Sequence, residues 1–261
     1  MPVADIDGTE FYYEIEGEGD WMVFAHGGGG THLDWWRQVY DFRGRYRCLT
    51  YDLRGLGQSR GEEDYSAAGS DLVALMDRLG IERAILNGHS AGGWAASHVA
   101  QRHPERVRAL IMTSTPFGFF VPALSAWADE MLGLLQGDFA VWDHMYSDHF
   151  KATQPQSHFL YAALGRLNAR LQVRGPDYVE RFEAAYRGMR DAPVQDYSAF
   201  STPSLFIVGG ADAMITPRLI RGVAEAVPGA AMVEIPQAGH YLPAEQPQAY
   251  AEAVSTFLAG L

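Results

Sequence analysis

Hydrophobic and polar positions follow two different periods along this chain. Short runs of mostly apolar residues predict strands that are buried on both faces, as at Trp21 to His26 and Ala84 to Asn87. Stretches with apolar residues three or four positions apart predict helices, as at Ser66 to Leu79, which Gly80 ends. Because strands and helices alternate, we expect right-handed β-α-β units on a mostly parallel sheet.

The same two patterns place the remaining elements. Further strands are predicted at Thr9 to Ile15, Arg45 to Asp52, Arg106 to Ser114, Ser204 to Gly210 and Ala231 to Pro236. Further helices are predicted at Leu33 to Phe42, Ala91 to Arg102, Pro217 to Ala226 and Ala244 to Leu258. We expect the first two of these strands along the chain, Thr9 to Ile15 and Trp21 to His26, to form an antiparallel edge of the sheet.

One long segment breaks the alternation. Residues 116–200 carry helical patterns without a convincing strand, and their aromatic residues include Trp127, Trp142, Tyr146, Phe150, Phe159, Tyr161, Phe182 and Tyr186. The sequence therefore predicts a core made of residues 1–115 and 201–261, with residues 116–200 inserted as a helical cap, or lid, over the strand ends. The alternative is that these helices are additional scaffold, whose aromatic residues fill a local core.

The composition limits the class of protein. The 261 residues, 48% of them hydrophobic, suit one large α/β domain. The net charge of −12 would repel phosphate groups, so we expect neither nucleic acid nor a membrane as a partner. The N-terminus lacks the pattern of a signal peptide, and the single cysteine, Cys48, leaves no internal disulfide. We expect a cytoplasmic protein that acts on a small molecule; a homo-oligomer is compatible with the sequence.

Chemistry first appears in the stretch GHSAG, which runs from Gly88 to Gly92 where a predicted strand gives way to a predicted helix. Small flanking residues allow the sharp turn of a G-x-S-x-G nucleophile elbow, which presents the serine hydroxyl at the carboxyl edge of a parallel sheet. The N-terminus of the following helix adds a partial positive charge near the developing alkoxide. Ser90 is therefore the candidate nucleophile.

A serine nucleophile needs a base, and the base needs a third group that holds it in one tautomer. His240 lies directly after the last predicted strand, and Asp212 lies in the loop after the strand before it. The chain order Ser90, Asp212, His240 matches the order of nucleophile, acid and histidine in this kind of site. Asp191 and Asp196 precede a predicted strand, so we expect them at the opposite edge or in the insertion.

An oxyanion hole is predicted from two backbone N–H groups. One is that of Ala91, directly after the nucleophile, and the other is that of Gly28 in the glycine run after His26, with Gly29 as the alternative. The run is not a phosphate-binding loop, because no lysine follows it and no dinucleotide pattern is completed.

The histidines of the predicted insertion do not form a recognisable metal-binding pattern. His144, His149 and His158 fall in the predicted insertion, but their spacing does not match that of a common ligand pair on a helix. We expect no metal.

These motifs resemble the α/β-hydrolase superfamily over essentially the whole chain. His26-Gly27-Gly28 is similar to its H-G-x strand end, Asp52 to Ser59 (DLRGLGQS) to its D-x-R-G-x-G-x-S turn, and GHSAGG to its elbow, while GGAD and AGH are similar to its acid and histidine loops. The resemblance implies an eight-stranded, mostly parallel sheet with helices on both faces, a helical cap and no cofactor.

This sequence differs from the motifs of several subfamilies, and these differences reduce the number of activities that the resemblance allows. Epoxide hydrolases and haloalkane dehalogenases use an aspartate nucleophile, which Ser90 is not. Proline iminopeptidases and C–C hydrolases carry a proline where this chain has Gly29 or Gly30, and C–C hydrolases favour tryptophan where it has Tyr241. The resemblance therefore implies a serine hydrolase that cleaves a carboxylic ester or lactone through an acyl-enzyme. The aromatic residues of the predicted cap indicate that its substrate is small and largely apolar. A C–C bond hydrolase of a ring-cleavage diketone product, a non-catalytic receptor-like member of the fold and a peracid side activity stay open.

Overall fold

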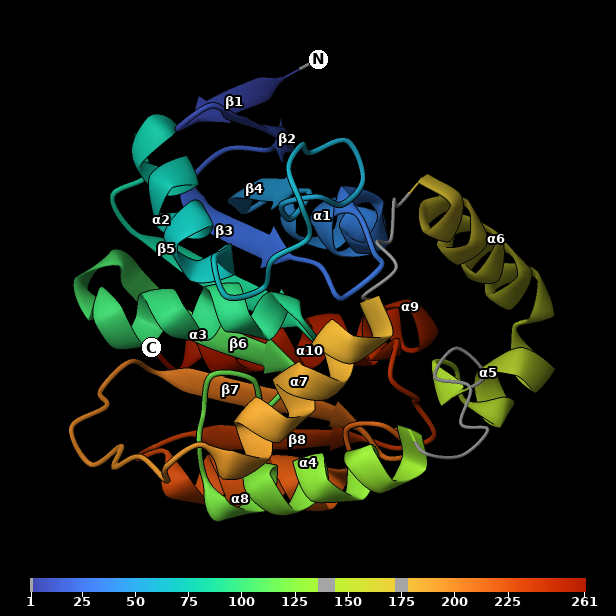
Figure 1. Ribbon diagram of the computed structural model, residues 1–261. Coiled ribbons are helices and arrows are strands. Elements are labelled where there is room, and N and C mark those ends of the chain that lie inside the picture. Colours follow the sequence, from blue (N-terminus) through green and yellow to red (C-terminus); the bar gives the residue numbers. More distant parts are fainter. Residues whose placement is uncertain (1, 136–143, 172–177) are drawn as a thin grey trace.

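A computed structural model describes residues 2–135, 144–171 and 178–261 of the chain (Figure 1). Its centre is one eight-stranded sheet in the order β1-β2-β4-β3-β5-β6-β7-β8. The strands are β1 (Val3–Ile6), β2 (Thr9–Glu16), β3 (Asp20–Ala25), β4 (Tyr46–Tyr51), β5 (Ala84–His89), β6 (Val107–Thr113), β7 (Ser204–Gly209) and β8 (Ala231–Ile235). The predicted mostly parallel α/β sheet is confirmed.

The antiparallel edge of the sheet differs from the sequence-based prediction. It consists of β1 and β2, and β2 also pairs antiparallel with β4. The prediction that Trp21 to His26 belongs to this edge is wrong, because β3 lies between β4 and β5 and runs parallel to both. Burial gives the reason: Met22 to Ala25 are fully buried, as a central strand requires, whereas half of β1 is exposed.

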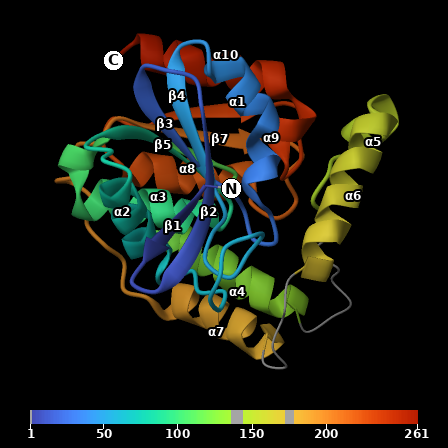
Figure 2. The same ribbon diagram turned by 90° about the horizontal axis from the view of Figure 1, so that it is seen from above.

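Helices cover both faces of the sheet (Figure 2). One face carries α1 (Trp36–Phe42) after the short η1 (His32–Trp35), and α10 (Pro247–Ala259) after the short α9 (Leu242–Glu245). The other face carries α2 (Ala68–Arg78), α3 (Gly92–Arg102) and α8 (Pro217–Ala226), with η2 (Pro104–Arg106) after α3. Two apolar clusters result, one on each face of the sheet.

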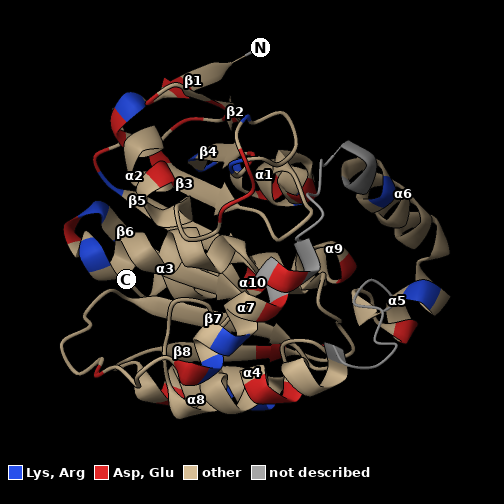
Figure 3. Ribbon diagram, viewed as in Figure 1, with Lys and Arg blue, Asp and Glu red and all other residues tan. Residues whose placement is uncertain are grey.

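The packing of these helices follows the sequence pattern. Leu75 of α2 and Val254 of α10 are fully buried, one in each apolar cluster. Burial of such a side chain stabilises the fold by about 1.5–3 kcal/mol. Acidic and basic residues fall mainly on the helices and the loops, and few fall on the central strands (Figure 3).

Among the described residues between β6 and β7 lie the helices α4 (Pro122–Leu135), α5 (Asp148–Thr153), α6 (Pro155–Leu171) and α7 (Tyr178–Asp191). No strand occurs there within the described residues, as the sequence predicts. In Figures 1 and 2, α4 and α7 lie together, whereas α5 and α6 form a separate pair at the side of the molecule. Trp142 and the side chain of Phe182 lie outside the described part of the chain.

Both helix pairs of this insertion rest on the core, but on different parts of it. The ring of Trp127 in α4 packs at a tilt against that of Tyr186 in α7, with 5.4 Å between ring centroids, and Trp127 Nε1 donates to the Met214 carbonyl after β7. Phe150 of α5 and Tyr161 of α6 form a small buried cluster with Ala244 of α9. The second pair therefore lies beside the loop that follows β8.

The carboxyl ends of β5, β7 and β8 lie at one edge of this sheet, because the three strands run parallel within it. Ser90 follows β5, Asp212 follows β7 and His240 follows β8. The fold thus brings together three loops that are far apart in the sequence, at the edge where open parallel sheets bind their ligands.

Candidate active site

The turn that carries Ser90 is sharp and strained. β5 ends at His89 and α3 begins at Gly92, and between them Ser90 has a φ of 47°, in the left-handed region that L-residues rarely adopt. Hydrogen bonds hold this geometry: the Ser90 N–H donates to the Thr113 carbonyl over 3.1 Å, and the Gly93 N–H donates to the Ser90 carbonyl over 2.8 Å. The Ser90 residue is half-buried. The strand, turn and helix that the elbow motif requires are all present.

Close backbone approach explains the glycines of the motif. A Cβ atom at Gly88 would lie 2.8 Å from the carbonyl oxygen of Gly92, and one at Gly92 would lie 2.2 Å from the carbonyl oxygen of Ala25 in β3. At Gly93 it would lie 2.4 Å from the Thr115 hydroxyl. The helix can start this close to the sheet only because these positions carry no side chain.

The structure brings His240 and Asp212 into direct contact. His240 Nδ1 donates to Asp212 Oδ2 over 2.9 Å, and both residues are buried, at 1% and 3% exposure. The other carboxylate oxygen, Oδ1, accepts from the backbone N–H groups of Met214 and Ile215, each over 2.9 Å. The carboxylate is therefore fixed on both sides, and it holds the histidine in the tautomer whose Nε2 is an unprotonated acceptor.

The contact between Ser90 and His240 is less direct. His240 Nε2 is buried and has no hydrogen-bond partner among the described residues, so the Ser90 hydroxyl is not bonded to it here. Both residues nevertheless border His89, whose ring lies 5.1 Å from that of His240. Catalytic hydrogen bonds often tighten only when a substrate is bound.

His89 has a role that the sequence patterns do not reveal. Its Nε2 donates to the backbone carbonyl of His240 over 3.0 Å, and its ring packs edge-on against Tyr241. Burial first, and then the charge of His240, lower the pKa of His89 to about 3. A neutral imidazole thus ties the end of β5 to the histidine loop.

The glycine run lies beside the elbow. The Gly30 N–H donates to the Gly27 carbonyl over 3.1 Å, which closes a tight turn, and Gly29 has a φ of 73°. A Cβ atom at Gly28 would lie 3.7 Å from the Cβ of Ala91, so the two positions predicted for the oxyanion hole are neighbours. As the residue before the first residue of α3, Ala91 has an N–H that no carbonyl within the helix accepts.

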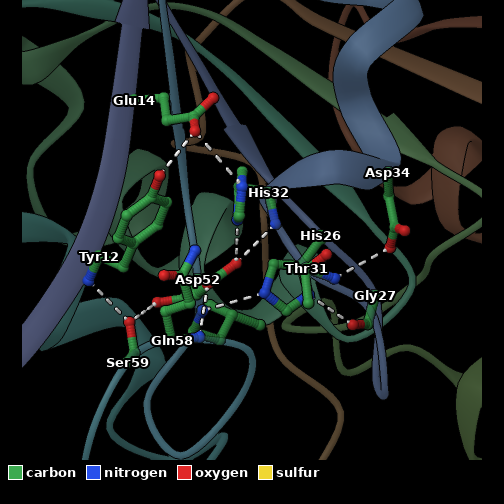
Figure 4. A network of polar contacts seen from close by, with 11 residues as sticks. Tyr12, Glu14, His26, Gly27, Thr31, His32, Asp34, Asp52, Gln58 and Ser59 are labelled. Carbon is green, nitrogen blue, oxygen red and sulfur yellow. Dashed lines mark hydrogen bonds and ion pairs between the residues drawn. The ribbon is translucent and has the colours of Figure 1, made fainter. Parts of the chain in front are cut away.

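Two histidines hold the ends of the glycine run (Figure 4). His26 Nδ1 donates to the Gly27 carbonyl over 2.7 Å, while its Nε2 accepts from the Leu53 N–H over 3.0 Å. At the other end, the backbone N–H and Nδ1 of His32 donate to Asp52 Oδ1 over 2.6 and 2.8 Å. Asp52 and Leu53 both belong to the DLRGLGQS turn. This turn therefore holds, through the two histidines, the glycine run that carries the predicted oxyanion donor Gly28.

The charges in this network favour an ion pair between Asp52 and His32. Burial opposes ionisation of both side chains, but their mutual hydrogen bond and charges outweigh it. The pKa of His32 is raised and that of Asp52 is lowered. Glu14 Oε1, 3.6 Å from His32 Nε2, adds to the effect on the histidine.

The rival candidates lie elsewhere. Asp191, at the end of α7, is exposed and bonded to the neighbouring Arg190, which lowers the pKa of this carboxyl group. Asp196 accepts hydrogen bonds from Ser198. Across the described residues, no group of three or more His, Cys, Asp or Glu side chains is arranged to hold a metal ion, and that includes His144, His149 and His158.

With its sheet, elbow and histidine–carboxylate pair in this arrangement, the chain can be placed in a family. Residues 20–247 match the family model of the alpha/beta hydrolase fold. The protein belongs to that family, and it is an α/β hydrolase.

Individual relatives are similar over the full length. The chain is 29% identical to the putative carbamate hydrolase RutD of Caulobacter sp. (strain K31), with 100% of this chain and 99% of that protein covered. The structure of the enol-lactonase from Burkholderia xenovorans LB400 has a TM-score of 0.76 and 26% identity, covering 99% of this chain and 100% of that one. Est816, described as an N-acyl homoserine lactone degrading enzyme, has a TM-score of 0.76 and 25% identity, covering 98% and 100%.

Of the helices in residues 2–135, 144–171 and 178–261, none has the length and hydrophobicity that a membrane-spanning segment requires.

Proposed function

We propose that this protein is a serine hydrolase that cleaves a carboxylic ester or lactone of a small, largely apolar substrate. The observation that carries the proposal is the buried His240, with Nδ1 bonded to Asp212 and Nε2 unpaired, at the sheet edge where the strained turn presents Ser90. The similarity to an enol-lactonase and to a lactone-degrading enzyme supports the substrate class.

In the proposed reaction, the Ser90 hydroxyl attacks the carbonyl carbon of the substrate while His240 Nε2 takes its proton. The alcohol part leaves with that proton, and an acyl-enzyme remains. Water then attacks the acyl group, with His240 again as the base, and releases the acid and the free serine. Asp212 stays ionised and stabilises the imidazolium in both steps.

The oxyanion that forms in each step is proposed to lie between the Gly28 and Ala91 N–H groups. One such donor contributes roughly 3–4 kcal/mol to transition-state stabilisation in comparable sites. The support is the side-by-side position of the two residues and the pinning of the glycine run at both ends by His26 and His32.

We further propose that residues 116–200 act as the cap of this site. The rings of Tyr146 and Tyr161 lie 5.6 and 6.2 Å from that of Tyr241, the residue next to the proposed base. Aromatic side chains from the insertion therefore reach the histidine loop, which supports an apolar substrate.

A carbamate is the second candidate substrate class. The observation in its favour is the full-length similarity to a putative carbamate hydrolase. Its carbonyl carbon accepts the same attack, and the proposed catalytic groups would act on it in the same way.

The test compares Ser90→Ala with the unchanged protein on a panel of short esters, lactones and carbamates. We expect the variant to lose at least about 10³-fold in kcat, because removal of one triad member is that costly. A serine-directed fluorophosphonate should label only the unchanged protein. Turnover of the variant near that of the unchanged protein would reject the mechanism, and turnover of a vinylogous diketone without ester turnover would replace it by C–C hydrolysis.

A further inference from the structure

Glu245 is a buried carboxylate that the proposed mechanism does not use. It ends α9, five positions after His240, and is 1% exposed. Burial raises the pKa of Glu245, and the negative charge of Asp212 adds a smaller effect in the same direction. Hydrogen bonds from Ser147 and Gly239 oppose this rise. A buried carboxylate is costly unless its hydrogen-bond donors are well placed.

The partners of Glu245 come from two different parts of the fold. Its Oε2 accepts from the Gly239 N–H over 2.9 Å, and Gly239 is the residue directly before His240. The same oxygen accepts from the Ser147 hydroxyl over 2.5 Å, and the Ser147 N–H lies 3.2 Å from Oε1. Ser147 belongs to the insertion and caps the N-terminus of α5. One carboxylate therefore joins the histidine loop to the inserted helices.

The residue on the other side of His240 is bound to the same short segment. The Tyr241 N–H donates to the carbonyl of Met145 over 3.1 Å. Both neighbours of His240 thus hold the three residues Met145 to Ser147, one directly and one through Glu245.

The backbones at this junction touch, which explains another glycine. A Cβ atom at Gly239 would lie 2.6 Å from the Ser147 nitrogen and 2.8 Å from Glu245 Oε1. The side chain of Gln154, at the end of α5, reinforces the contact by donating to the Glu245 carbonyl over 3.0 Å. No side chain could be added between the segment and the loop without separating them.

We propose that Glu245 is a positioning residue. It couples the orientation of His240 to the packing of the segment Met145–Ser147 against the histidine loop. The expected effect of this coupling on activity rests on the proposed function, whereas the structural coupling itself does not. The segment of the insertion then serves as a support for the base, and an insertion displaced from the loop would leave His240 its bonds to Asp212 and His89 but not this support.

The test uses hydrogen exchange at three backbone amides: Gly239, Tyr241 and Ser147. In Glu245→Gln the side chain loses its charge and one terminal atom becomes an N–H donor. If the NH₂ group takes the Oε1 side it faces the Ser147 N–H, and if it takes the Oε2 side it faces the Gly239 N–H, so at least one of these bonds is lost and the bonds that remain are to a neutral acceptor. We expect exchange at all three amides to accelerate about tenfold or more, because loss of a hydrogen bond to a charged group reduces protection by about that factor. The Tyr241 amide is the informative one, because the substitution leaves its own acceptor, the Met145 carbonyl, in place.

A second variant guards against loss of folding. Ser147 lies outside the central sheet and the helices that cover it. Ser147→Ala should nevertheless accelerate exchange at the Gly239 amide, whose acceptor Glu245 is unchanged. The matched control is Glu252→Gln on the exposed side of α10, which should change none of the three amides.

Kinetics separate positioning from general destabilisation. For Glu245→Gln we expect kcat to fall about tenfold or more with a smaller change in KM, because a misplaced base slows the chemical step. Exchange that accelerates only at amides whose own hydrogen bond was removed would overturn the coupling. If Ser90→Ala kept its activity, the proposed function would fail while the exchange result still stood.

Discussion

The imidazole of His89 donates a hydrogen bond to the backbone carbonyl of His240, with 3.0 Å between Nε2 and the oxygen. The residue directly before the proposed nucleophile thus holds the loop of the proposed base. Because burial lowers the pKa of His89 to about 3, the ring stays neutral over the working range of most hydrolases and keeps a single proton for this bond.

His89→Phe tests this bond, since it keeps a ring of similar size but removes the donor. The buried His240 carbonyl would be left without its partner, and we expect the free energy of unfolding to fall by about 1–3 kcal/mol. Urea denaturation measures the change, and kcat on a short ester should fall with it. His103→Phe, at a half-exposed site, is the control. An unchanged unfolding midpoint in His89→Phe would show that the bond does not support the loop.

Asp212→Asn should abolish most of the activity while preserving the fold. Because Oδ1 accepts from the Met214 and Ile215 N–H groups, the amide oxygen must take that side, and the NH₂ group then faces His240 Nδ1. The imidazole is forced into the tautomer with a proton on Nε2, which cannot act as a base. We expect kcat to fall by about 10⁴-fold, as for the corresponding change in other triads.

The control for this prediction is Asp191→Asn, which removes an exposed pair with Arg190 and should leave kcat unchanged. A collapse of activity in that variant, with Asp212→Asn still active, would mean that the acid has been assigned to the wrong loop.

Local signals were enough to predict most strands and the position of the three catalytic candidates. The apolar run before Ser90 and the glycines around it lie within a few positions of each other. Asp212 and His240 each lie a few positions after their own predicted strand. Strand pairing is different, because it depends on segments far apart. The central place of β3 and the existence of β1 followed only from the structure.

The hydrogen bonds that support the histidine loop could not be predicted either, because they too join residues far apart in the sequence. His89 and His240 are 151 positions apart, and Ser147 and Glu245 are 98 apart, so no short pattern links them. One boundary could have been found: the helix predicted from Ala244 to Leu258 is broken at Gln246, because a proline follows and the residue before a proline avoids the helical conformation.

Two glycine-to-alanine substitutions should have opposite effects on stability. In Gly92→Ala the new methyl group would lie 2.2 Å from the Ala25 carbonyl oxygen, so α3 must move away from β3. We expect a loss of several kcal/mol, or no folded protein, because buried backbone cannot yield as a side chain can. In Gly188→Ala, on α7, nothing lies within 4 Å, and a gain of up to about 1 kcal/mol is expected from helix propensity.

Thermal unfolding of both variants beside the unchanged protein decides this prediction. Equal melting temperatures for the two variants would contradict it, since the close contact between the elbow helix and β3 would then have no energetic consequence.

The pair formed by His32 and Asp52 predicts a dependence of stability on pH. The folded-state pKa of His32 lies above its ordinary value of 6.5, so the protonated histidine stabilises the fold. This contribution is fully present below pH 6.5 and is lost as the pH rises through the folded-state pKa. His32→Asn keeps a donor that can face Asp52 but cannot become charged.

The difference in unfolding free energy between the unchanged protein and His32→Asn should therefore be larger at pH 5.5 than at pH 8.5. Both values lie well above the range in which Asp52 titrates, since the pKa of that carboxyl group is lowered by its bonds to His32. Urea denaturation at the two pH values gives the comparison, with His103→Asn as the control at a half-exposed histidine. A difference that stays constant, or grows toward pH 8.5, would mean that the charge of His32 does not help to hold the glycine run in place.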